Sequence, residues 1–402
     1  MDATFYPLAC AVQPYAWGQR GAPGRPPYIA ELLGRPDNGQ PQAELWIGGH
    51  PSLPARLTVD GRERSLAELA AAEPAAVLGD PEATGFPFLL KILSCDAALS
   101  IQAHPDPAVA RILHAKDPAH YPDPFPKPEL AIAITPFEAL CQFRPVAEIR
   151  AEAGRLPALG AFLAAAGVRP TLADDPWLRA AYAALFRAPQ GQIPPLCRAL
   201  ATAVQAVPVR TAHDDLYLRL LAAYPDDRGA VSAYFLNHLQ LQPGECIYLA
   251  ANEPHAYLRG TILECMANSD NVVRAGLTPK HVDTEVLLAM LTYSQDGVHF
   301  LSPAHNGAGV RGYIPPTPEF QVDLLTPAAG GGLALDSGGA VSLLLVLEGA
   351  AELRTPRGAV FAAPRGSIWL WPACLERAEI RFTAPDSEVV RARPNMLAFD
   401  RL

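Results

Sequence analysis

Four residues far apart in the chain have the side-chain types of a metal site: Gln102, His104, Glu129 and His255. Alternate side chains of an extended segment point the same way, so Gln102 and His104 share one face of their run. Pro128 favours an extended backbone at Lys127, which places Lys127 and Glu129 on one face in the same manner. Two histidines, one carboxylate and one amide oxygen suit Zn²⁺, with iron or manganese also possible. We therefore predict one zinc ion per chain, held by these four residues.

Each of these segments, taken singly, also has an ordinary structural interpretation. A hydrogen-bonded edge strand would explain the first segment, and a surface histidine would explain His255. An exposed pair of Lys127 and Glu129 would contribute almost nothing to stability. The continuously apolar run 130–134 that follows indicates a buried strand, which argues against an exposed pair.

A continuous stretch, 255–280, supplies further groups that could act on a substrate. It contains a strand that carries Glu264, then a polar turn that includes Asp270, and then Arg274. Arg274 and Lys280 are candidates for anchoring an anion, because a guanidinium offers bidentate geometry. A solvated surface cation is the ordinary interpretation of either residue taken singly.

Lysine is rare in this chain, so each lysine is informative. Only four lysines occur, against 28 arginines: Lys91, Lys116, Lys127 and Lys280. Arginine serves wherever a generic cation suffices, so a retained lysine indicates that an ammonium group is needed. Sequence drift is the alternative, and it suffices for Lys116.

Short apolar runs separated by Pro and Gly predict the strands that must position these residues. We expect strands at 44–47, 88–93, 99–103 and 130–134, then at 248–250 and 262–266, and finally at 341–347, 351–353, 359–363 and 368–371. A capping box predicts a helix over 65–72, and an N-cap at Asp283 predicts another over 283–292. Helical spacing of Ala and Leu over 145–227 predicts a helical block, in which Asp175 would cap a helix that starts at Pro176.

Composition limits the class of protein. Half of the residues are hydrophobic and 18% are charged, as in a folded protein, and the net charge of −9 disfavours nucleic acid and anionic membranes as partners. The apolar runs are far shorter than the ~20 residues of a membrane span, and we find no signal peptide. Seven cysteines without a Cys-x-x-Cys pair predict reduced thiols in a cytoplasmic protein.

The stretch 255–280 resembles the signature of type I mannose-6-phosphate isomerases at nearly every position. Other pieces agree: Tyr15-Ala16-Trp17-Gly18, Glu44-Leu45-Trp46-Ile47-Gly48 leading to His50-Pro51-Ser52, and Phe86-Pro87-Phe88 with Leu90-Lys91. The resemblance covers most of residues 5–145 and 230–300 and is weaker elsewhere. It implies a cupin-superfamily fold and the interconversion of mannose 6-phosphate and fructose 6-phosphate through a cis-enediol.

The same resemblance assigns roles to residues of this chain. The family's zinc ligands fall on the four residues that strand alternation indicates, and its active-site arginine falls on Arg274. Residues that line the family's pocket fall on Trp17, Ser100, Lys127, Tyr257, Glu264 and Asp270. We expect Lys127 to polarise an oxygen or move a proton, and we expect Glu264 or Asp270 to transfer protons. The remaining candidates, for the phosphate group, are Lys91, Ser100 and Lys280.

One departure from the family pattern concerns the residues just before Lys127. The family usually has Asn-His there, whereas this chain has Phe125 and Pro126. A mechanism that requires that histidine as a proton carrier therefore does not transfer to this chain, and the replacement could instead mark a changed substrate preference.

Two other function classes compete with the isomerase. Two histidines and a carboxylate also fit a non-haem iron dioxygenase, and a sugar-binding cupin without catalysis would bind ligand without turnover. The fold class that we expect is mainly β, with two cupin-like β-barrels or jelly rolls and an α-helical domain. The expected domains are a catalytic one of 1–144 and 230–310, a helical insert of 145–229, and a C-terminal jelly roll of 311–402. We expect a monomer that acts on a small phosphosugar.

Overall fold

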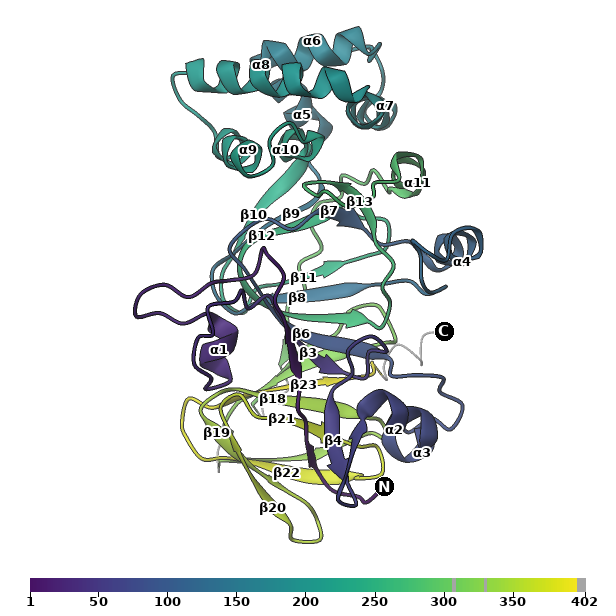
Figure 1. Cartoon of the computed structure of the whole chain (residues 1–402), viewed down its shortest axis with the longest axis vertical. Coiled ribbons are helices and arrows are strands. Elements are labelled where there is room, and N and C mark those ends of the chain that lie inside the picture. The colour runs from purple at the N-terminus through teal and green to yellow at the C-terminus, as the bar shows by residue number, and fades with distance from the viewer. Residues whose placement is uncertain (306–308, 329–330, 396–402) are drawn as a thin grey trace.

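The computed structural model describes residues 1–305, 309–328 and 331–395, and the molecule is elongated (Figure 1). A block of helices forms one end, a ten-stranded sheet lies in the middle, and the strands of the C-terminal residues form the other end. The predicted fold class, mainly β with a helical region, is confirmed.

The ten-stranded sheet carries all four predicted metal ligands within its strands or at their ends. It contains β2 (Ala11–Gln13), β3 (Glu44–Gly48), β6 (Phe88–Cys95), β7 (Ile101–Ala103), β8 (Glu129–Ala133), β9 (Phe137–Phe143), β10 (Leu236–Leu241), β11 (Cys246–Leu249), β12 (His255–Ala267) and β13 (Val273–Gly276). The four strands predicted before residue 145 correspond to β3, β6, β7 and β8, with ends that differ by up to two residues.

Strand β12 organises this sheet, because it pairs with four other strands. Near His255 it pairs antiparallel with β7 and β9, and near Glu264 it pairs antiparallel with β6 and β8. Between them, Gly260 has a φ of 110°, and a Cβ atom there would lie 2.5 Å from the carbonyl oxygen of Pro136. Only glycine adopts this conformation readily at so close an approach. The bend lets one strand carry both His255 and Glu264 past different partners.

The helical block is formed by the segment in which Ala and Leu recur at helical spacing. It contains α5 (Val146–Arg155), α6 (Pro157–Ala165), α7 (Asp174–Arg187), α8 (Ile193–Ala206), α9 (Ala212–Ala223) and α10 (Arg228–Val231), with 3₁₀ turns at Gln190–Gln192 and Ser232–Tyr234. The predicted start of α7 is wrong: Ala173 is its N-cap residue, and Pro176 is its third residue. Proline is tolerated there because the first N–H groups of a helix have no partner within the helix.

The other helices lie around the sheets. They are α1 (Tyr28–Leu32), α2 (Leu66–Ala72), α3 (Pro74–Val77), α4 (Pro107–Lys116) and α11 (Thr284–Met290). The predicted capping box of α2 is present, with Ser65 accepting a hydrogen bond from the backbone N–H of Glu68, and Asp283 caps α11 as predicted. Among the described helices, none combines the length and the apolar character needed to cross a membrane.

The C-terminal residues build two further sheets, and the first strand of the chain joins one of them. The seven-stranded sheet contains β1 (Tyr6–Pro7), β14 (Ala304–His305), β15 (Val310–Tyr313), β16 (Gln321–Leu325), β18 (Ser342–Glu348), β21 (Ile368–Trp371) and β23 (Glu388–Arg393). The four-stranded sheet contains β17 (Gly332–Asp336), β19 (Ala350–Arg354), β20 (Val360–Pro364) and β22 (Arg377–Phe382). A separate hairpin is formed by β4 (Arg56–Val59) and β5 (Arg62–Ser65). The pairing of β1 with β21 ties the first residues to the far end of the chain.

One apolar core joins the ten-stranded and the seven-stranded sheets. Leu45 and Ile92 from the former share it with Leu343 and Val390 from the latter, and all four side chains are fully buried. Burying such side chains stabilises the fold by ~1.5–3 kcal/mol each. The sheet that carries the metal ligands is therefore backed by a packed core, which fixes the positions of its strands.

Candidate metal centre and active site

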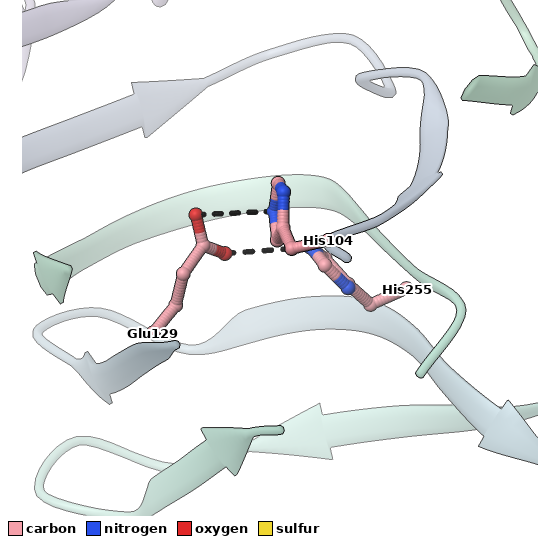
Figure 2. A group of neighbouring side chains, drawn as sticks. All are labelled: His104, Glu129 and His255. Atoms are coloured by element: carbon pink, nitrogen blue, oxygen red, sulfur yellow. Dashed lines mark ion pairs between the residues drawn. The ribbon is translucent and has the colours of Figure 1, made fainter. Parts of the chain in front are cut away.

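His104, Glu129 and His255 come together at the ends of three strands of the ten-stranded sheet (Figure 2). Glu129 and His255 are the first residues of β8 and β12, and His104 directly follows β7. The Nε2 of His104 lies 3.3 Å from one carboxylate oxygen of Glu129, and the Nε2 of His255 lies 3.4 Å from the other. One donor atom from each residue lies within 4.8 Å of the other two, and each residue is 1% exposed. Three buried donors at this spacing can share one divalent ion.

Buried polar atoms at this centre without hydrogen-bond partners are suited to bind a cation. The Nε2 of His104 and the Oε2 of Glu129 are buried without a hydrogen-bond partner, which is costly unless an ion satisfies them. Gln102 lies opposite His255 in the strand register, with its amide nitrogen 3.4 Å from the Nε2 of His255. A half-turn of that amide group would direct its oxygen to the same place, and Gln102 would then offer the fourth of the predicted donors.

Backbone carbonyl groups orient both histidine rings. The Nδ1–H of His104 donates to the carbonyl oxygen of Asn271 at 2.7 Å, and the Nδ1–H of His255 donates to that of Glu253 at 3.1 Å. Because a carbonyl oxygen only accepts, each Nδ1 must carry the proton, and each Nε2 keeps its lone pair for a metal.

The protonation states also suit metal binding. Burial lowers the pKa of His104 to about 4, with Lys127 adding to the effect, so the imidazole is neutral near pH 7. Burial opposes ionisation of Glu129, but Lys127 and the two histidines outweigh it and hold the pKa of Glu129 well below its usual value. The carboxylate is therefore charged, and neither His104 nor Glu129 has to lose a proton before an ion binds.

A cavity of about 660 Å³ opens onto this centre. Its wall includes Gln102 and Glu129 among the predicted ligands, whereas the two histidines lie beneath it. Other predicted site residues in the wall are Trp17, Lys91, Ser100, Lys127, Tyr257, Glu264, Arg274 and Lys280. The volume is within the ~300–1,000 Å³ typical of small-molecule pockets.

Two cations of the wall have no carboxylate partner. Arg274 lies opposite Gln102 in the register of β13 and β7, and Lys280 lies four residues after the end of β13. Neither side chain forms an ion pair within the described part of the chain. A cation in a cavity without a counter-ion attracts an anionic ligand.

Lys91 is placed differently, because it lies between two carboxylates. Its Nζ is 3.0 Å from Glu264 and 3.9 Å from Glu44, and all three side chains are buried. Burial opposes the charge of Lys91, but Glu264 and Glu44 outweigh it and raise the pKa of this lysine. Burial raises the pKa of Glu264, although Lys91 opposes it. Lys91 therefore stays charged, and Glu264 takes up a proton more readily than an ordinary glutamate does.

Asp270 lies beside the cavity and is absent from its wall. Its carboxylate lies 3.4 Å from the Nε2 of His50, whose Nδ1 lies 2.8 Å from the hydroxyl of Ser52. The hydrogen bond with His50 lowers the pKa of Asp270 despite partial burial, and Lys127 and Lys91 add to the effect. Apart from the two buried histidines, Asp270 is thus the one predicted site residue that is absent from the cavity wall.

Several residues of this region were not predicted from the sequence. Glu44 lies in the cavity wall, and His50 contacts Asp270. Both belong to the family-like run 44–52, which could have indicated them. Tyr224 reaches the wall from the end of α9, and its hydroxyl donates to the carbonyl oxygen of Ala98 at 2.5 Å. No local pattern marks a tyrosine of the helical block as part of a distant cavity.

Comparison with known proteins shows that the chain is similar to mannose-6-phosphate isomerases. Residues 5–146 match the family model described as phosphomannose isomerase type I, catalytic domain. The mannose-6-phosphate isomerase of Bos taurus is 37% identical over 415 residues, which cover 94% of this chain and 96% of that protein. The one of Ogataea parapolymorpha is 39% identical over 373 residues, covering 85% and 87%. A solved structure of mannose 6-phosphate isomerase with zinc bound has 30% identity and a TM-score of 0.86 and covers 98% of this chain and 100% of that one.

Proposed function

The chain belongs to the type I phosphomannose isomerase family, and we propose from this premise how its own residues interconvert mannose 6-phosphate and fructose 6-phosphate. The observation that carries the proposal is the convergence of His104, Glu129 and His255 beneath a cavity that also contains unpaired cations. The reaction requires ring opening and then the movement of a proton between C1 and C2 of the sugar.

The zinc ion would be held by Gln102, His104, Glu129 and His255. When bound, it supplies positive charge that stabilises negative charge on the two substrate oxygens. Only one of the four donors is anionic, so the centre keeps a net positive charge. The orphaned buried atoms of His104 and Glu129 support this assignment.

The phosphate group would bind to Ser100 and Lys280, which both lie in the cavity wall. Lys280 has no carboxylate partner there, whereas the charge of Lys91 is balanced by Glu264 and Glu44. We therefore assign the phosphate to Lys280 and Ser100 and not to Lys91. Trp17 and Tyr257 in the wall would form apolar contacts with the sugar.

Arg274 and Lys127 would act at the reacting end of the sugar. Arg274 lies opposite the ligand Gln102 in the strand register, and the Nζ of Lys127 is 2.8 Å from the ligand Glu129. Both cations are thus next to the centre where charge develops on the substrate oxygens. Lys127 can also move a proton, which an arginine cannot do near neutral pH.

Two acids are candidates for the proton transfer itself. The pKa of Glu264 is raised and that of Asp270 is lowered, a divergence that is typical of an acid and a base. Glu264 lies in the cavity wall, whereas Asp270 would have to act through a neighbour. This arrangement favours Glu264 as the group that exchanges a proton with the sugar.

A coupled isomerase assay with wild type and His104→Ala, with the metal content measured in both, tests the proposal. We expect stoichiometric zinc and isomerisation of mannose 6-phosphate by the wild type, and loss of both in the variant. Stoichiometric iron with oxygen uptake would instead indicate a dioxygenase, and binding of the sugar without turnover a carbohydrate-binding protein. Equal activity in the two proteins would remove His104 from any essential role.

We further propose that the protein works as a monomer in the cytoplasm. All seven cysteines are free thiols, and six of them are buried, which fits a reducing compartment. Light scattering of the purified protein after size-exclusion chromatography would test the monomer: a mass near 42.9 kDa is expected, and twice that value would contradict it.

A further inference from the structure

We propose that Asp123 is a positioning residue that sets the geometry of the metal centre from outside the ligand set. It lies in the loop between α4 and β8, four residues before Lys127. The inference rests on the proposed metal site, and it concerns a residue for which the chemistry of the reaction itself gives no role.

The carboxylate of Asp123 holds three consecutive residues of the turn that follows β12. Its Oδ1 accepts hydrogen bonds from the hydroxyl of Ser269 at 2.8 Å and from the side-chain amide of Asn271 at 3.1 Å. Its Oδ2 accepts from the backbone N–H of Asp270 at 2.9 Å. Its backbone carbonyl accepts from the same amide of Asn271 at 2.6 Å. Charge-assisted bonds of this kind are stronger than neutral ones, so they fix this turn firmly.

Residues 269–271 of this turn also hold the proposed metal ligand His104. The carbonyl oxygen of Asn271 accepts the Nδ1–H of His104 at 2.7 Å, and this bond sets the orientation of the ring and directs Nε2 at Glu129. Asn271 is fully buried, and its side chain is held by Asp123. The position of the carbonyl group therefore depends on a carboxylate that is two contacts away from the proposed metal ligand His104.

The neighbouring backbone supports the same turn. The carbonyl oxygen of Phe125 accepts from Ser269 at 3.2 Å and from the amide of Asn271 at 2.9 Å, whereas the Phe125 side chain is 54% exposed. This stretch of the loop thus contributes its backbone and not its side chain. The presence of Phe125 and Pro126 where the family usually has Asn-His is therefore compatible with an intact metal centre.

A carboxylate is needed at position 123, because donors approach both of its oxygens. In Asp123→Asn one acceptor oxygen remains, and the new NH₂ group would face a donor, so the variant keeps the shape of the side chain and loses part of the contact. In Asp123→Ala all side-chain contacts are lost. Substitution of such outer residues typically weakens metal binding by about 10- to 100-fold.

The test is a zinc affinity measured by chelator competition on metal-depleted wild type, Asp123→Asn and Asp123→Ala. Asp117→Ala is the matched control, because the ion pair of that half-buried aspartate is formed with its neighbour His120. We expect zinc binding about 10- to 100-fold weaker in Asp123→Ala, an intermediate loss in Asp123→Asn, and a change below about twofold in the control. Added zinc should restore the isomerase activity of Asp123→Asn.

Thermal unfolding of the metal-free proteins separates positioning from simple destabilisation. A lower melting temperature with wild-type zinc affinity would overturn the proposal, and so would wild-type affinity in both Asp123 variants. If Asp123→Ala does not fold, Asp123→Asn decides alone. Absence of stoichiometric zinc from the wild type would instead refute the proposed metal site and this inference with it, whereas equal binding by wild type and variants refutes the inference alone.

Discussion

The ammonium group of Lys127 lies 2.8 Å from the Oε1 of Glu129, and both side chains are buried. Glu129 is the one carboxylate of the predicted zinc ligands, so this contact places a lysine directly beside the proposed metal centre. The pair is more than a stabilising ion pair, because the same lysine lies in the wall of the cavity.

Replacing Lys127 should impair the reaction more than it impairs metal binding. We expect Lys127→Met to lower kcat by ~10²–10⁴-fold, since loss of a positioned proton-transfer group has effects of this size, while zinc remains bound. Steady-state kinetics and metal analysis of one preparation would check this. Lys116→Met is the control, because Lys116 is exposed on α4, and its kinetics should not change. Unchanged kcat in Lys127→Met would remove Lys127 from the mechanism.

The stability of the metal-free protein should fall as the pH decreases from 6.5 to 4. The pKa of buried His104 is about 4 in the folded state, and that of an unfolded histidine is ~6.5. Between these values the unfolded state binds more protons, so the stability that is present above pH 6.5 is lost progressively, by about 3 kcal/mol for this residue. Urea unfolding at pH 7 and pH 5 should show a larger loss in wild type than in His104→Gln. Equal losses in the two proteins would contradict this assignment.

Glu264 and Asp270 should differ in how strongly they affect turnover. Glu264 lies in the cavity wall with a raised pKa, so Glu264→Gln should lower kcat by ~10²–10⁴-fold. Asp270→Asn should have a smaller effect, because Asp270 faces His50 and would act only through it. Kinetics of the two variants, with zinc content matched, would decide between the acids. A larger loss in Asp270→Asn would reverse the assignment.

The helical block should influence substrate binding through Tyr224. Its hydroxyl donates to the carbonyl oxygen of Ala98, two residues before the proposed phosphate ligand Ser100. Loss of a hydrogen bond worth about 1 kcal/mol in Tyr224→Phe should raise KM roughly fivefold with little change in kcat. Tyr6→Phe is the matched control, because that hydroxyl donates to the carbonyl oxygen of Asp2, far from the cavity. An unchanged KM in Tyr224→Phe would show that this contact does not shape the cavity.

The sequence by itself determined the donor types and much of the local structure. Alternation along a strand places Gln102 and His104 on one face without knowledge of any partner strand, and the capping box of α2 lies within four residues. Similarity to a known family added the active-site role of Arg274 and further residues of the cavity wall, such as Trp17 and Tyr257. Where local signals were ambiguous, as at the start of α7, the predicted boundary was wrong by two residues.

Only the tertiary structure decided which of these groups meet, because contacts between distant segments depend on strand register and packing. The register of β12 pairs His255 with Gln102 and Glu264 with Lys91. It thereby makes Lys91 part of an acidic cluster, although the sequence indicated a phosphate ligand. Asp123 and Tyr224 each contact a segment at least 120 residues away in the chain. Such contacts leave no periodic pattern in the sequence from which they could be predicted. The sequence thus specifies the types of side chain and the local structure around them. The geometry of the site depends on the pairing of distant segments, which no local pattern specifies.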